Sequence, residues 1–154
     1  MPWHTPERKA EQALKLYFQT VLGYELTGVQ FTTRFSNAVL TEPRVEIYCT
    51  DCEPWEMEGS PYTGNWKLTI TLKIVSHYAE AVDAEAHDNI VGNLLDQLLI
   101  VDENGNESAS AEINATQNEA DLTVLLVDVG TRSNAVEEHS LVTEQELVLY
   151  VKPS

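Results

Sequence analysis

The clearest hydrophobic pattern in the chain is a strict alternation over residues 66–74. The even-numbered positions are apolar, namely Trp66, Leu68, Ile70, Leu72 and Ile74. The odd-numbered positions are polar, namely Lys67, Thr69, Thr71 and Lys73. A period of two over this length predicts a β-strand with one buried face, whose second face meets either water or a partner.

Two segments show the three- and four-residue spacing of amphipathic helices. The first covers residues 6–22, with Thr5 as its cap, a proline at its first position and Gly23 as its stop. Its apolar stripe consists of Ala10, Ala13, Leu14, Tyr17, Phe18 and Val21. The second begins near Glu80 and ends around Leu99, and its stripe consists of Ala84, His87, Ile90 or Val91, Leu94 and Leu98.

Four further segments have strand patterns, namely residues 28–35, 44–50, 122–130 and 143–152. Residues 131–140 are polar and are expected to form a turn region. The proline- and glycine-rich stretch CEPWEMEGSPYTGN is expected to connect two antiparallel strands. Residues 101–121 form a long polar insert, which either contains a short helix or hairpin or is a loop, and loops of this length are commonly functional or disordered.

These elements predict a single α+β domain over residues 1–154. Its sheet of about five strands is mostly antiparallel, and two helices pack on one face, in the order α-β-β-β-α-β-β. The apolar fraction of 43% is that of a folded chain. There is no apolar run long enough to span a membrane and no signal-peptide pattern at the N-terminus, so a cytosolic compartment is expected.

Charge changes this picture, because the formal net charge is -16 and the bases are unevenly placed. The interval between Lys73 and Arg132 contains no lysine or arginine. Its twelve acids are Glu80, Asp83, Glu85, Asp88, Asp96, Asp102, Glu103, Glu107, Glu112, Glu119, Asp121 and Asp128. Such a surface repels phosphate, so specific nucleic-acid binding is not expected. It is either a solubilising face or a surface that faces DNA without adhering to it.

Candidate chemistry is sparse. The CTDC motif places Cys49 and Cys52 at a strand end beside acids, where thiol pKa values rise, and no second ligand pair completes a zinc site. His4, His77, His87 and His139 are scattered, and His87 on a helix stripe is interpreted as a packed residue. No nucleophile, phosphate or dinucleotide motif is present. The chain is therefore expected not to be an enzyme and to use no metal or cofactor.

Two groups of residues are candidates for a subunit interface. The aromatic side chains Trp55, Tyr62 and Trp66 lie in or beside the proline- and glycine-rich stretch, and either shield the core or dock on a neighbour. Lys67 and Lys73 lie on the second face of the 66–74 strand, which is either solvated or set against an acidic neighbour. Head-to-tail association of unlike surfaces would use this asymmetry to close a ring.

One family shares this layout. An N-terminal helix precedes EPRVEIYCTDCEPWE, then GNWKLTITLKIVSHYAE, an acidic helix AHDNIVGNLLDQLL and a closing strand pair. From about Glu11 to Val151 this order resembles the small tail-terminator and tail-completion proteins of long-tailed bacteriophages and prophages. The long polar insert and the CTDC pair are departures from the family pattern.

The resemblance implies a homo-oligomeric ring, commonly a hexamer, at the head-proximal end of the tail. Its partners would be the tail-tube and head-connector proteins, and its location the virion neck after assembly in the host cytoplasm. The candidate acidic lumen, which DNA would pass without adhering, consists of Glu80, Asp83, Glu85, Asp88, Asp102, Glu103 and Glu107. The alternative is an acidic regulatory or DNA-mimic protein that occupies a basic site on a partner.

Overall fold

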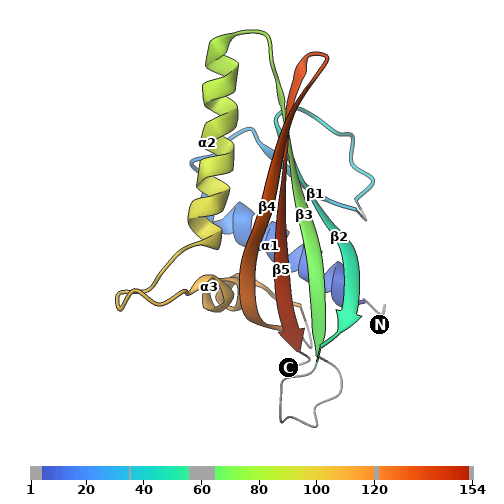
Figure 1. Cartoon of the computed structure of the whole chain (residues 1–154), viewed down its shortest axis with the longest axis vertical. Helices are drawn as coiled ribbons and strands as arrows, with labels where there is room; N and C mark the ends of the chain where they lie inside the picture. Colours follow the sequence, from blue (N-terminus) through green and yellow to red (C-terminus); the bar gives the residue numbers. More distant parts are fainter. Residues whose placement is uncertain (1–4, 35, 56–64, 120–121, 153–154) are drawn as a thin grey trace.

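The computed structural model describes residues 5–34, 36–55, 65–119 and 122–152. The chain folds into three helices and five strands (Figure 1). In chain order these are α1 (Pro6–Leu22), β1 (Gln30–Thr33), β2 (Arg44–Pro54), β3 (Trp66–His77), α2 (Ala81–Leu98), α3 (Ala109–Thr116), β4 (Thr123–Glu137) and β5 (Ser140–Lys152). The predicted single α+β domain with a mostly antiparallel five-stranded sheet is confirmed.

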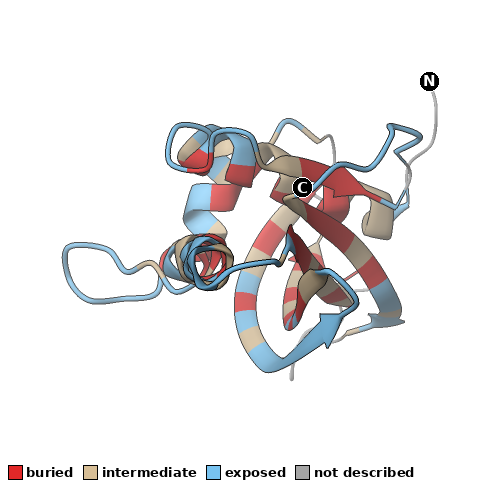
Figure 2. Ribbon diagram, turned by 90° about the horizontal axis from the view of Figure 1, so that it is seen from above, coloured by how far each residue is buried: buried red, intermediate tan, exposed pale blue. Residues whose placement is uncertain are grey.

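The sheet has the strand order β1-β2-β3-β5-β4. β1 pairs with β2 in parallel, and every other pairing is antiparallel. β3 occupies the centre, which agrees with its near-complete alternation between buried and partly exposed side chains. Figure 2 shows that the sheet is curved rather than flat.

The helices lie on one face of the sheet. Most of the side chains that face them along the three central strands are apolar: Val45, Ile47 and Cys49 of β2, Leu68, Ile70, Leu72 and Ile74 of β3, and Leu147, Leu149 and Val151 of β5. α1 contributes the largest aromatic side chains, Tyr17 and Phe18, both fully buried. Burial of this apolar surface is the main stabilising term of the domain.

The region predicted as a polar insert contains the third helix. An isolated bridge between Val101 and Glu107 closes a turn, and α3 follows directly. Ile113 of α3 is fully buried, and the side chain of Asn114 bonds both the N–H (2.9 Å) and the carbonyl (2.8 Å) of Val124. These contacts join α3 to the start of β4, so this helix of the insert belongs to the core, whereas residues 101–107 are exposed.

The prediction of a turn region at residues 131–140 is wrong. β4 continues to Glu137 and β5 begins at Ser140, so the two strands form a long hairpin with a two-residue loop. Glu138 in this loop has a positive φ of 47°. All residues from Thr131 to His139 are exposed, which removes the apolar alternation that marks a strand in sequence.

Candidate assembly surface

Among the described residues, no helix packs on the second face of the sheet, which we call the uncovered face. Side chains alternate between the two faces along each strand, and paired residues of neighbouring strands share a face. The uncovered face therefore includes Tyr48 of β2, Thr69 and Thr71 of β3, and Val148 and Tyr150 of β5. These side chains are partly exposed. The alternation of β3 therefore has the two faces that the sequence predicts, and Lys67 and Lys73 lie on the uncovered one.

Carboxylates flank both lysines on this face. Lys73 stands between Glu46 of β2 and Glu144 of β5 in the register of the sheet. Lys67 Nζ lies 3.5 Å from Oε1 of Glu53, its partner on β2. The uncovered face is thus a surface of alternating charge instead of a basic stripe.

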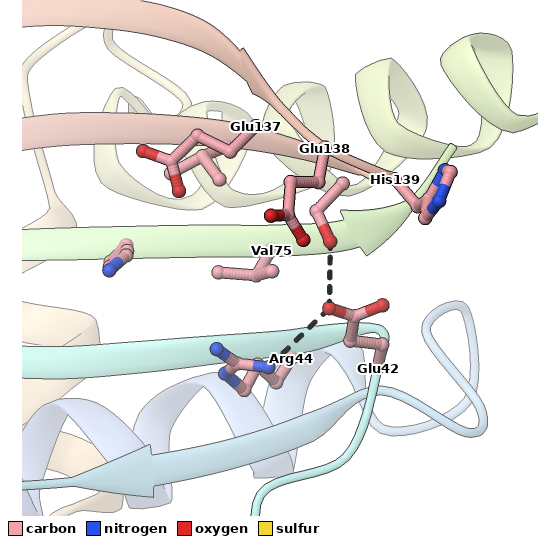
Figure 3. Close-up of a pocket in the computed structure, with 9 residues that line it drawn as sticks. Glu42, Arg44, Val75, Glu137, Glu138 and His139 are labelled. Carbon is pink, nitrogen blue, oxygen red and sulfur yellow. Dashed lines mark hydrogen bonds and ion pairs between the residues drawn. The ribbon is translucent and has the colours of Figure 1, made fainter. Parts of the chain in front are cut away.

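A hollow of about 480 Å³ lies at one end of the uncovered face (Figure 3). Arg44 lines this hollow, and its guanidinium forms two ion pairs. Its Nε lies 3.1 Å from Glu46 Oε2, and its Nη1 lies 3.8 Å from Glu42 Oε1. The hydroxyl of Ser140 donates a 2.9 Å hydrogen bond to the same Glu42 oxygen. The start of β2 is thereby tied to the tip of the β4–β5 hairpin across the end of β3.

The buried carboxylate beside this hollow is fully engaged. Glu46 is only 4% exposed and accepts hydrogen bonds from Arg44 and from the hydroxyl of Tyr48. Burial, together with the hydrogen bond to Glu46, raises the pKa of Tyr48 to about 12. Tyr48 is therefore a neutral donor at physiological pH, and the cluster is a structural tie with no group poised for proton transfer.

The structure separates two of the predicted interface aromatics. Trp66 points towards the helices and packs against the core. Trp55 lies at the other end of the uncovered face from the hollow, where its ring meets that of Tyr150 with centroids 4.8 Å apart. Tyr62 falls outside the described residues. Of the aromatic candidates, Trp55 is the one placed on the uncovered face, with Tyr150 as a companion that the sequence did not single out.

The predicted acidic residues extend along α2 and the turn that follows it. Asp83 Oδ2 accepts from the N–H groups of Ala79 and Glu80, which lowers its pKa, and so it caps α2. Asp102 Oδ1 accepts from the N–H groups of Asn104 and Asn106 and holds the turn. The remaining members, all exposed, are Glu80, Glu85, Asp88, Glu103 and Glu107.

His87 is buried between α2 and the sheet, as its place on the helix stripe predicted. Its Nδ1 lies 2.7 Å from Ser76 Oγ and its Nε2 lies 2.7 Å from Thr143 Oγ1. Thr143 in turn donates to Asn134 Oδ1 at 2.8 Å. Burial lowers the pKa of His87, so the neutral ring joins α2 to β3 and β5. The sequence signal for the two partners of His87 is that Ser76 of β3 and Thr143 of β5 are polar residues on the buried face of their strands.

Both cysteines of the CTDC motif face the helices, because a bulge between Cys49 and Asp51 shifts the strand register. Both thiols are free. Burial raises the pKa of each to about 12. In the described residues no group of three or more potential metal ligands is clustered. The interpretation of Cys49 and Cys52 as structural residues stays a prediction.

No protein-family model matches the chain, and no curated protein matches it either. Within the described part of the chain, no helix is both long enough and apolar enough to cross a membrane.

Proposed function

We propose that this chain is a structural subunit of a bacteriophage tail. In this proposal it is a tail-terminator or tail-completion protein that forms a ring at the head-proximal end of the tail and joins it to the head connector. The observation that supports it best is the sheet face on which no described helix packs, which includes the partly exposed Tyr48, Val148 and Tyr150. Such a face is suited to contact with another protein, because it presents partly exposed aromatic and aliphatic side chains.

The uncovered face and the long exposed hairpin give this function a physical basis. The residues of the hairpin from Thr131 to His139 are exposed, and the N-terminal half of α2 lies beside the hairpin. The tie between Ser140 and Glu42 holds the hairpin against the rest of the sheet. An exposed hairpin held in a fixed direction offers its side chains to the neighbouring subunit, or to the end of the tail tube.

The acidic flank of α2 supports the same proposal. The exposed carboxylates there have no lysine or arginine between residues 73 and 132 to neutralise them. Placed along the lumen of a ring, they would meet the phosphates of passing DNA with like charge and keep it from adhering.

Mixing the pure protein with polymerising tail-tube protein tests the proposal. Negative-stain electron microscopy is expected to show tubes of limited length with a ring at one end. Tube protein alone, polymerised at the same concentration, is the control for spontaneous arrest. A chain that neither binds tubes nor changes their length would overturn the proposal, whatever its own oligomeric state.

The acidic flank also favours a second candidate, a DNA-mimic protein that occupies a basic partner site. Glu85 and Asp88 are exposed on the ordered helix α2, as mimicry of a phosphate row requires. A pull-down that recovers a nuclease or another DNA-binding protein would favour this candidate, provided that the affinity falls steeply with salt. Recovery of tail-tube or connector proteins would favour the first.

A further inference from the structure

Helix α2 is held to the sheet unevenly along its length. Its C-terminal half contributes apolar side chains to the core, namely Ile90, Val91, Leu94 and Leu98. Of residues 81–89, all of which the structure describes, only His87 is buried. A hollow of about 160 Å³ lies between this part of the helix and the β4–β5 hairpin. The N-terminal half of α2 is therefore held to the sheet through one buried polar side chain.

The hydrogen bonds of His87 define which ring nitrogen carries the proton. The hydroxyl of Thr143 donates to Asn134 Oδ1 at 2.8 Å, so Thr143 Oγ1 must accept from His87 Nε2 at 2.7 Å. Nε2 therefore carries the proton, and Nδ1 accepts from the hydroxyl of Ser76 at 2.7 Å. The neutral ring thus uses its one donor and its one acceptor, and it connects α2 with β3 and β5.

A second proton on this ring has no favourable place in the docked arrangement. It would be added at Nδ1, where the Ser76 hydroxyl already directs its own proton, so that hydroxyl would have to turn away. The charge would also be buried, because His87 is only 5% exposed and its ring contacts no carboxylate among the described residues. A buried charge without a partner of opposite sign is costly, whereas a solvated imidazolium is not. Protonation therefore favours an arrangement in which the ring reaches water.

The charged groups around the ring do not offset this cost. Burial lowers the pKa of His87, and the exposed Asp88 on the same helix opposes that shift without cancelling it. The charged residues closest along β4 and β5 are Arg132, which would oppose a positive ring, and Glu144, which lies on the uncovered face. The strands present only neutral groups to the ring and its partners, namely Ser76 of β3, Asn134 of β4 and Thr143 of β5.

We propose that protonation of His87 releases residues 81–89 from the sheet, while residues 90–98 stay docked. The released segment includes Asp83, Glu85 and Asp88, so acidification moves part of the acidic flank. The open form is favoured at low pH because the ring takes up its second proton in water only there. This inference goes beyond the proposed tail function and does not depend on it.

Native-state hydrogen exchange of the full chain, followed by NMR at low urea concentrations, tests the release. The opening constant of amides 85–89 is expected to rise by up to about tenfold for each pH unit below the ordinary histidine pKa of 6.5, because the open form binds the proton more tightly. This opening should depend weakly on urea, since it exposes little surface, whereas amides 94–98 should keep the steep urea dependence of global unfolding. One shared opening constant and urea dependence for both groups would overturn the inference, as would a local opening that does not change with pH.

Two variants assign the effect to the ring. His87→Gln keeps a hydrogen-bonding side chain that cannot be charged, so the opening of amides 85–89 should lose its pH dependence. The matched control is His77→Gln, which removes an exposed imidazole that acts on the cap carboxylate Asp83. The pKa of Asp83 is lowered, so this cap stays charged through the titration, and His77→Gln should keep the wild-type pH dependence. Loss of the dependence in His77→Gln, or its survival in His87→Gln, would overturn the assignment. The wild-type titration alone can refute the release should His87→Gln fail to fold.

Discussion

Oε2 of Glu11, in the middle of α1, accepts a 2.9 Å hydrogen bond from the backbone N–H of Cys49 in β2. Its Oε1 accepts from the N–H of Arg34 at 3.2 Å, and the Arg34 guanidinium donates to the carbonyl of Cys49 at 3.2 Å. β1 ends at Thr33, so these side chains continue the edge of β2 where the parallel strand stops. The polar pairing leaves this stretch of edge unavailable for joining another sheet.

Glu11→Ala is expected to lower the free energy of unfolding by about 3 kcal/mol, because it leaves two backbone donors without their acceptor inside the protein. Glu11→Gln keeps one acceptor oxygen and is expected to cost less. Urea denaturation monitored by circular dichroism measures both. Gln12→Ala, one position along the same helix and only partly buried, is the control. A loss no larger than that of the control would show that the carboxylate has no such role.

The His87 cluster predicts a pH dependence of stability. Burial lowers the pKa of His87 below its ordinary value of 6.5, while Asp88 opposes the shift. The other groups that contact the ring, Ser76 and Thr143, are neutral. The unfolded chain therefore binds the proton more tightly, and the free energy of unfolding decreases as the pH falls through 6.5.

Replacement of this imidazole is expected to remove that slope. His87→Gln should show a flatter dependence of stability on pH than the wild-type chain when urea denaturation is repeated between about pH 7.5 and about pH 5, a range that brackets the ordinary histidine pKa. His139→Gln removes an exposed imidazole and should keep the wild-type slope. Equal flattening in the two variants would assign the slope to surface histidines.

The two thiols are predicted to be unreactive in the folded protein. With pKa values raised from 9.0 to about 12, each has about a thousandfold less thiolate at neutral pH than a free cysteine. Labelling with a chromogenic disulfide reagent is expected to be slow until denaturant is added and then to reach both thiols. Cys52→Ser separates the half-buried thiol from Cys49. Rapid native labelling would reopen a redox role for the motif.

The sequence predicted those parts of the fold in which burial leaves a periodic trace. The strand at residues 66–74 and the helix at residues 6–22 have one apolar face each, and both were placed within a few residues of β3 and α1. The hairpin at residues 131–140 left no trace, because both of its faces are exposed. A short helix within the polar insert was only one of the alternatives that the sequence left open, because Ala109 and Ile113 are the two buried residues of α3 in a polar context.

The candidate surface was predictable only in part. The alternation of residues 66–74 placed Lys67 and Lys73 together on one face. Their acidic neighbours come from other strands, and the hydrophobic pattern of a single segment does not determine which strands pair with it. The Trp55–Tyr150 contact and the Ser140–Glu42 bond likewise join residues about a hundred positions apart. The loop between β1 and β2 is held by the side chain of Gln30, which bonds to the backbone of Val39 and Thr41. The sequence has no regular signal for such bonds.

Reversal of the charge at Lys73 tests whether the alternating charges of the uncovered face stabilise the sheet. Lys73→Glu sets three carboxylates side by side across three strands, with Glu46 and Glu144 on its flanks. Like charges on directly opposed strands are destabilising, so a loss of about 1–2 kcal/mol in the free energy of unfolding is expected. The matched control is Lys152→Glu, whose cross-strand neighbour is Thr123. Urea denaturation at low salt should show the loss for Lys73 alone, and added salt should reduce it, because the repulsion is screened. Equal effects at the two positions would mean that net charge, and not strand register, sets the cost.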